Sequence, residues 1–143
     1  HFLFVVPQYS ETGNREYGLF LKDRTPSPAY STLENFTYYM GEGNYKGIIR
    51  DLPEGTYGYL FNNGENDIAV FWKESGEGYV QVQNNGNAVM ADIMGNETAV
   101  NPINGIISIP VSMDPVYLIF DEDAEESIKS VFGEENPKVY YIE

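Results

Sequence analysis

Cysteine is absent from this chain of 143 residues, and histidine occurs once, at the terminal position His1. Without cysteine there is no disulfide framework, no thiolate zinc site and no thiol nucleophile. A Ser–His–Asp triad is excluded as well, because its histidine would have to be the terminal one. The missing cysteine does not decide the cellular compartment.

Basic residues are scarce. Eight Lys and Arg face 22 Asp and Glu, which gives a formal net charge of -14. Nucleic acid is therefore a poor partner, since phosphate binding relies on basic side chains, and anionic membrane surfaces are disfavoured for the same reason. No apolar run approaches the roughly 20 residues of a membrane-spanning helix. The chain opens without Met or a signal-peptide pattern, which we expect of a fragment or a processed chain.

What is present predicts a folded domain. The length suits one domain with its own core, and 42% of the residues are hydrophobic. Tyrosine occurs 12 times. A tyrosine buries a large ring and keeps a polar hydroxyl, so it suits half-exposed sheet faces and sugar-contacting surfaces alike. In a β protein we expect most of these tyrosines to serve packing.

The first part of the chain predicts one helix. Phe2 to Val6 and Tyr17 to Leu21 are short apolar runs, of which the first reads as a buried strand. Ser27-Pro28 is a helix-start signal, and Gly41 with Gly43 would end the helix. Residues at helical spacing predict one apolar face that packs on a sheet: Ala29, Leu33, Phe36 and Met40.

From Tyr45 the pattern changes to short strands separated by turn signals. Three Asn-Gly pairs, beginning at Asn63, Asn85 and Asn104, favour tight hairpin turns. Pro110 cannot donate a ladder hydrogen bond, so its strand should lie at an edge or end there. We expect strands near Gly47–Arg50, Thr56–Phe61, Ile68–Lys73, Tyr79–Gln83, Val89–Met94, Ile106–Val111 and Val116–Phe120.

The predicted fold class is mainly β: an antiparallel β-sandwich of about seven or eight strands with Greek-key-like connections and one packed N-terminal helix. Val80 and Val82 alternate with Gln81 and Gln83, as one buried and one wet face require. The run Ile68 to Trp72 is apolar throughout, which predicts a central strand covered on both sides. The tail departs from this pattern, with a short helix expected at Ser127–Phe132 and a last strand at Val139–Ile142.

Three passages carry a family resemblance: GLFLKDRTPSPAYSTLENF (18–36), YLFNNGENDIAVFW (59–72), and ADIMGNETAV (91–100) with SMDPVYL (112–118). In this order and spacing they resemble the C-terminal region of a (β/α)₈-barrel glycoside hydrolase, where the end of the barrel is followed by a small β-sandwich. The resemblance implies that residues 1–44 are the remnant of the barrel end (strand, loop and helix). It implies that residues 45–143 are the β-sandwich, with an acidic tail from residue 121.

The resemblance also implies a function. The two carboxyl groups of a glycosidase would come from earlier barrel strands, so we expect no catalytic residue here and no enzyme activity from this chain alone. Its partner would be its own upstream catalytic barrel, of about 250 residues, and its role structural support in carbohydrate degradation. A parent that acts on polysaccharide would suit a secreted or cell-surface location, although the sequence leaves the location open.

Two sets of residues are candidates for sugar contact. The resemblance places Glu11 and Glu16 in the last barrel loop, where they would line a substrate subsite; the simpler reading is two solvated loop carboxylates. Tyr57, Tyr59, Trp72 and Tyr79 would form an aromatic platform for a sugar ring, which makes a carbohydrate-binding module the alternative function. Because Trp72 lies in the most apolar strand, core packing is the favoured reading for it.

The acidic run Asp121 to Glu126 offers oxygen ligands of the kind that Ca²⁺ prefers. It lacks the glycine and the closing glutamate of an EF-hand loop, so a solvated acidic face is the favoured reading. We expect no metal and no cofactor. The same run is the only hint of a third function, a protein-interaction module.

Overall fold

The computed structural model describes residues 9–11, 15–84 and 86–120, and this part of the chain is mainly β. It contains one helix, α1 (Pro28–Met40), and a small hairpin of β1 (Tyr9–Glu11) and β2 (Arg15–Tyr17). The eight further strands are β3 (Asn44–Ile48), β4 (Thr56–Asn62), β5 (Asp67–Lys73), β6 (Gly78–Gln83), β7 (Ala88–Ala91), β8 (Glu97–Val100), β9 (Ile106–Val111) and β10 (Val116–Phe120).

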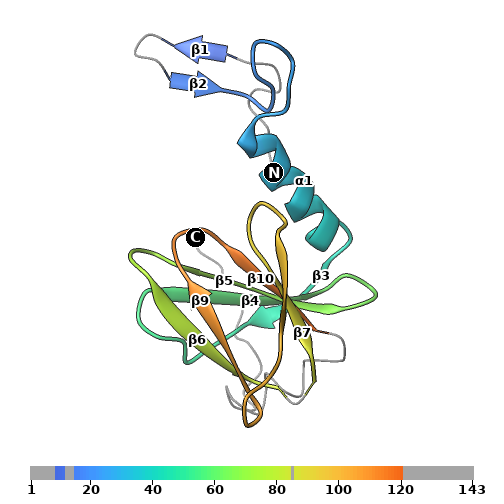
Figure 1. The fold of residues 1–143 in the computed structure, drawn as a ribbon, viewed down its shortest axis with the longest axis vertical. Coiled ribbons are helices and arrows are strands. Elements are labelled where there is room, and N and C mark those ends of the chain that lie inside the picture. Colours follow the sequence, from blue (N-terminus) through green and yellow to red (C-terminus); the bar gives the residue numbers. More distant parts are fainter. Residues whose placement is uncertain (1–8, 12–14, 85, 121–143) are drawn as a thin grey trace, which may run out of the picture.

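These eight strands form an antiparallel β-sandwich, as predicted (Figure 1). One sheet has six strands in the order β3-β4-β5-β10-β7-β8, and the other pairs β6 with β9. The chain crosses to the small sheet at β6, returns for β7 and β8, and crosses again at β9. The last of the described strands, β10, then enters the large sheet between β5 and β7. This long-range return is the connection that defines a Greek key.

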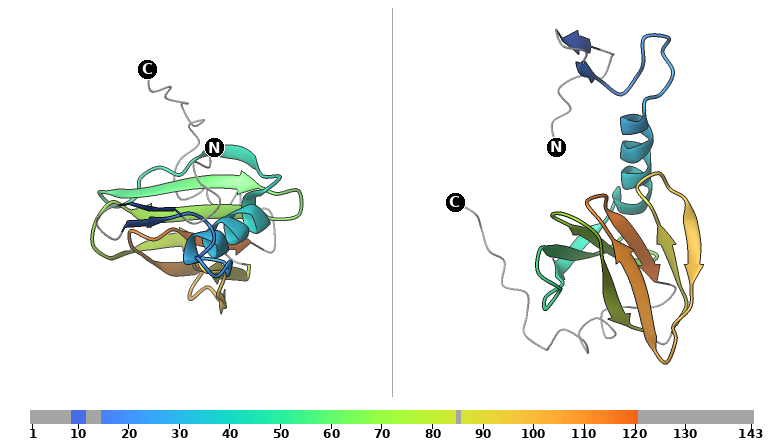
Figure 2. Two further views of the ribbon diagram at one scale, coloured as in Figure 1. Left: turned by 90° about the horizontal axis from the view of Figure 1, so that it is seen from above. Right: turned by 60° about the vertical axis from the view of Figure 1, so that its left-hand side comes forward.

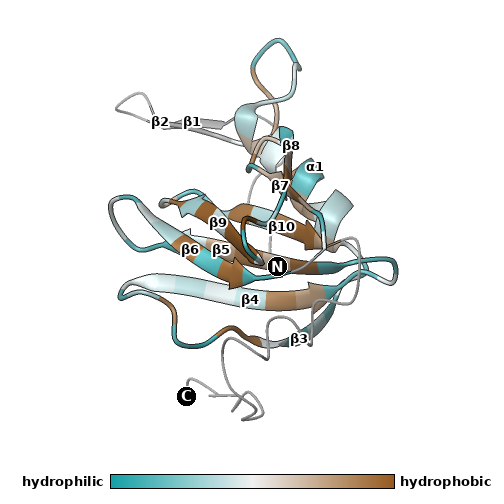
Figure 3. Cartoon of the chain, turned by 60° about the horizontal axis from the view of Figure 1, so that its bottom comes forward, coloured by the Kyte–Doolittle hydropathy of each residue, from teal (hydrophilic) through white to brown (hydrophobic). Residues whose placement is uncertain are grey.

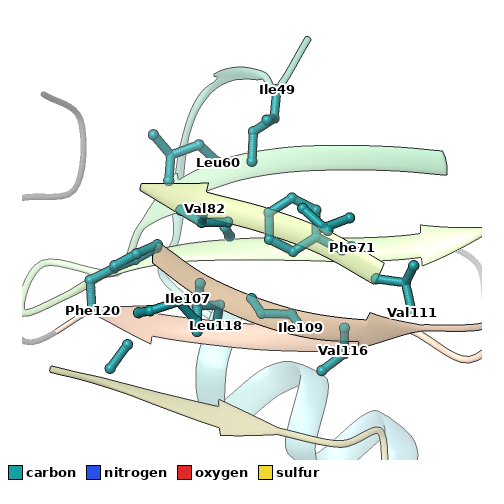
Figure 4. Packing of buried hydrophobic residues seen from close by; sticks show 13 residues of the cluster. Ile49, Leu60, Phe71, Val82, Ile107, Ile109, Val111, Val116, Leu118 and Phe120 are labelled. Carbon is teal, nitrogen blue, oxygen red and sulfur yellow. The ribbon is translucent and has the colours of Figure 1, made fainter. Parts of the chain in front are cut away.

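The core lies between the two sheets. Val80 and Val82 on β6 and alternate residues of β9 point inward against Phe71 and Leu118 (Figure 4). The polar residues between them face outward, which confirms the predicted alternation. Gly58 allows a close approach in this layer, because a Cβ there would lie 2.9 Å from the Phe71 ring. Figure 3 shows the resulting pattern, with hydrophobic residues concentrated in strands such as β5, β9 and β10 and hydrophilic residues in the loops.

Turn chemistry differs among the Asn-Gly pairs. Asn104 and Gly105 both have positive φ, 53° and 77°, and Ile103 and Ile106 exchange two backbone hydrogen bonds of 2.9 and 3.1 Å around them. This is the predicted tight turn. The pair at Asn63 lies instead in a four-residue connection, 63–66, in which the Asn63 side-chain oxygen accepts from the backbone N–H of Glu65 and of Asn66. The pair at Asn85 includes a position outside the described residues.

Helix α1 begins after Ser27, with Pro28 at its first position, as predicted. It ends at Met40, and the backbone N–H of Gly41 donates to the Thr37 carbonyl oxygen at 2.7 Å. Towards its end α1 contacts the β7–β8 turn, where Asn35 Nδ2 donates to the Ile93 carbonyl oxygen at 3.4 Å. Its C-terminal end docks more closely on the sandwich: Tyr39 and Met40 are 6% and 8% exposed. They pack with Ile68, Ala91 and Tyr117 on the outer face of the large sheet.

The prediction that the apolar face of the helix packs on a sheet is therefore wrong over most of the length of the helix. Of its four residues only Met40 is buried; Leu33 is half-buried, Phe36 is 38% exposed and Ala29 is exposed. The reason is the direction of the helix, which runs away from the sandwich instead of lying along a sheet face (Figures 1 and 2). Whether residues 1–44 belong to a barrel stays a prediction.

Strand bounds depart from the prediction by more than one residue at three places. β3 begins at Asn44, three residues early, and its register with β4 shifts between Tyr45 and Gly47. β7 ends at Ala91 because the Asp92 carboxylate accepts bonds from the N–H groups of Met94 and Asn96, which closes a turn. β8, unpredicted, follows that turn. The elements expected at 2–6, 127–132 and 139–142 lie outside the described residues.

Candidate functional site

Three of the four predicted sugar-contact aromatics come together on the outer face of the large sheet. Tyr57 and Tyr59 lie on β4 and Trp72 on β5, with Tyr57 directly opposite Trp72. The Trp72 indole stacks with both tyrosine rings, at centroid distances of 5.5 and 5.4 Å and interplanar angles of 24° and 13°. Tyr45 of β3 continues the series, 6.3 Å from the Tyr59 ring. We call these four side chains the aromatic row.

The aromatic row offers little free ring face to a sugar. A sugar packs its C–H groups on the flat face of a ring, and here the indole and its tyrosine neighbours cover one another's faces. Trp72 is half-buried by these contacts and lies outside the inter-sheet core, so the expectation that it packs in the core is wrong. β5 is central, as predicted, but its outer face is covered by the helix end only around Ile68 and not at Trp72.

Tyr79 is separated from the other three. It lies on β6 in the small sheet, pairs with Pro110, and is 68% exposed. Its neighbours Val80 and Val82 point into the core, so Tyr79 points out of the opposite side of the sandwich from Trp72. The four predicted aromatics therefore do not form one surface.

Glu11 and Glu16 lie on the β1–β2 hairpin. Glu11 is opposite Arg15 and Glu16 is opposite Ser10, so the two glutamates occupy neighbouring positions in the ladder. Their proposed place along a substrate subsite stays a prediction. The acidic run 121–126 lies outside the described residues, and within residues 9–11, 15–84 and 86–120 no group of three His, Cys, Asp or Glu could hold a metal ion. None of the described helices is long and apolar enough to cross a membrane.

A polar junction fixes the end of α1 to the sheet. The Tyr39 hydroxyl donates to Glu97 Oε1 at 2.9 Å, and Asn63 Nδ2 donates to the Tyr39 carbonyl oxygen at 3.4 Å. The Tyr39 ring packs 5.1 Å from the Tyr117 ring. Burial first, and then the nearby Glu97 carboxylate, raise the pKa of Tyr39 well above its usual range. Burial also raises the pKa of Tyr117. Both hydroxyls therefore stay protonated at neutral pH.

Beside this junction lies a cleft of about 280 Å³. We call it the junction cleft. Its apolar residues are Ile68, Val89 and Ile119, from three adjacent strands of the large sheet, and its other lining residues are Tyr38, Tyr39, Asn63, Glu65, Asn66 and Glu97. No motif marked these residues, because they come from the helix end, one loop and four strands. A weak signal was the Tyr38–Tyr39 pair, of which only one member can face the sheet.

The sequence matches no protein-family model and no curated protein. Solved structures do match. A family 39 glycoside hydrolase from the gut symbiont Bacteroides cellulosilyticus has a TM-score of 0.64 over 78% of this chain, with 17% identity. A family 30 subfamily 8 xylanase from Clostridium acetobutylicum has a TM-score of 0.53 over 73% of this chain, with 10% identity.

The match covers 24% of the family 39 structure and 31% of the xylanase, so this chain corresponds to a minor part of each. At these identities the likeness is one of fold. The structural neighbours are glycoside hydrolases, as the sequence passages suggested.

Proposed function

We propose that this chain is a non-catalytic accessory β-sandwich of a glycoside hydrolase, which supports an upstream catalytic barrel. The observation that carries the proposal is the coverage of the fold match. A glycoside hydrolase structure accommodates 78% of this chain while leaving about three quarters of its own length unmatched. The unmatched portion leaves room for a separate catalytic unit, and the two catalytic carboxyl groups would lie there.

The exposed surface supports this role. The aromatic row forms a continuous apolar strip on the same outer face that α1 contacts, with Tyr45 and Tyr57 still 47% and 42% exposed. Leu21, which precedes the helix, and Phe36, which lies in it, are exposed to a similar degree. Contiguous apolar surface of this kind marks protein contacts. The barrel would cover this strip and the exposed residues of α1.

Turnover measurements test the non-catalytic part of the proposal. The chain by itself should hydrolyse no member of a panel of aryl glycosides above blank. Turnover that disappears in Glu11→Gln or Glu16→Gln would place catalysis in this chain and refute the proposal. The upstream coding sequence gives an independent check, because it should encode a barrel with two positioned carboxyl groups.

Interface variants test the supporting role. Tyr57→Ser should change the stability of this chain by no more than about 1 kcal/mol, because the ring is partly exposed. In the full-length protein the same change should lower the melting temperature of the barrel as well, since it would remove a buried contact. Tyr79→Ser, on the opposite side of the sandwich, is the matched control and should leave the barrel unaffected.

A carbohydrate-binding module is the second candidate. The aromatic row gives it little support, since its ring faces are already stacked. The observation that favours it is the junction cleft, whose lining combines aromatic, apolar and carboxylate groups.

A further inference from the structure

We propose that the junction cleft binds one pyranose unit of a neutral saccharide. The proposal rests on the shape and lining of the cleft and does not require an upstream barrel. It also differs from the predicted sugar platform, because the residues involved are Tyr38, Glu65 and Glu97, not Trp72 and its neighbours.

The size of the cleft selects a small ligand. Its volume of about 280 Å³ lies just below the range for small-molecule sites, roughly 300–1,000 Å³. A site of this size holds a single ring. A longer saccharide would have to leave through the open side of the cleft, which is compatible with binding one unit of a polymer.

The lining combines apolar and polar groups, which complement the two kinds of surface that a sugar presents. A pyranose presents C–H groups on its faces and hydroxyl groups around its rim. Ile68, Val89 and Ile119 give the cleft an apolar base. Tyr38 stands at the side with 75% of its surface exposed, and its ring meets the Tyr39 ring edge to face at 5.1 Å. Because Tyr39 is buried while Tyr38 is not, the exposed ring of Tyr38 is available for the C–H face of a sugar.

Two carboxylates provide acceptors for the hydroxyl rim. Glu97 Oε1 accepts from the Tyr39 hydroxyl, which fixes the position of the carboxylate and leaves Oε2 as the second acceptor. Glu65 lies in the β4–β5 connection, where Asn63 Oδ1 accepts from its backbone N–H and from that of Asn66 at 3.1 and 2.8 Å. These bonds hold the loop that carries Glu65. Hydrogen bonds from hydroxyl groups to carboxylates are charge-assisted and are stronger than neutral ones.

The charge of the cleft selects against acidic ligands. Its two charged residues are both glutamates, and no Lys or Arg occurs among its lining residues. The chain as a whole carries a net charge of -14. A uronic acid or a sulfated sugar would meet like charge at this site. A neutral sugar meets no such repulsion, and its hydroxyl groups donate to the carboxylates.

Binding can be measured by NMR titration of the isotope-labelled chain with neutral xylo- and cello-oligosaccharides. We expect saturable shifts of the backbone amides of Tyr38, Glu65 and Glu97. Tyr38→Ala and Glu65→Gln should each weaken binding by about fivefold or more, through the loss of one ring contact and of one charge-assisted hydrogen bond, respectively. Both positions are exposed, so both variants should fold. Glu74→Gln, an exposed acid on the β5–β6 turn, and Tyr57→Ala are the matched controls and should bind like the parent.

Three results would overturn the proposal. The first is no saturable shift at tens of millimolar saccharide. The second is a set of shifts centred on Trp72 or Tyr79, which would restore one of the predicted aromatic surfaces. The third is binding of glucosamine oligomers without binding of neutral ones, which would make the cleft a cation site. None of these results bears on the supporting role, which the aryl glycoside assay and the full-length protein test separately.

Discussion

Docking of the helix end depends on Met40, and its truncation gives the sharpest test of the structure. Met40 is almost fully buried and packs with Ile68, Ala91 and Tyr117. Truncating a buried Met or Leu to Ala typically costs about 2–5 kcal/mol. Because Met40 is the most exposed buried member of this cluster, at 8%, we expect the lower part of that range, about 2–3 kcal/mol, for Met40→Ala.

Urea denaturation followed by the fluorescence of Trp72, the only tryptophan, measures this cost. For small proteins the free energy of unfolding falls by about 1–3 kcal/mol per molar urea, so the midpoint should fall by about 0.7–3 M. Glu34→Ala, on the exposed side of the helix, should stay within about 0.5 kcal/mol of the parent. Phe36→Ala should fall between the two. Equal midpoints for Met40→Ala and Glu34→Ala would refute the docked arrangement.

Three further substitutions probe the turns and the junction. Gly95→Ala should lower the unfolding midpoint more than Gly64→Ala, because both glycines have positive φ but only a Cβ at 95 would meet the Asn35 side chain, at 2.5 Å; equal losses would show that the helix does not contact this turn. The pKa of Asp92 is lowered chiefly by the hydrogen bond from the Asn96 side chain. In thermal melts Asp92→Ala should therefore destabilise the protein at neutral pH, and progressively less as the pH falls below about 4. A loss of the same size at pH 2 would contradict this. The raised pKa of Tyr39 means that its contribution to stability is full below the unfolded-state pKa of about 10 and decreases above it. Tyr39→Phe should therefore reduce the fall of the melting temperature between pH 10 and 11, and an unchanged fall would count against this.

Much of the β-sandwich could be predicted because its signals are local. β9 and β10 have the predicted bounds, since alternation or a short apolar run bounded by turn residues defines each. β8 could not be predicted, because its four residues are mostly exposed and include no apolar alternation. Its existence depends on the turn at Asp92, which brings it beside β7.

The positions of the site residues depended on long-range arrangement. An apolar run such as Ile68 to Trp72 predicts a central strand, but it does not reveal which end the helix will cover. The sequence also could not separate Tyr79 from Trp72, because the assignment of each strand to a sheet is set by crossovers. The junction cleft needs Tyr38, Glu65 and Glu97 together, and these residues lie 27 to 59 positions apart in the sequence.

The late position of β10 in the chain governs the order in which this protein can assemble. During synthesis β3, β4 and β5 can pair as soon as they emerge, and so can β7 and β8, but the two groups join only through β10. Until residues 116–120 are available, the facing edges of β5 and β7 have unpaired backbone groups next to apolar side chains. Long-range pairing of this kind is slow and exposes a chain to aggregation. The docking of α1 waits for the same strand, because Tyr117 is part of the cluster that receives Tyr39 and Met40. Synthesis of this sandwich therefore passes through a half-formed sheet, which persists until residues 116–120 have left the ribosome.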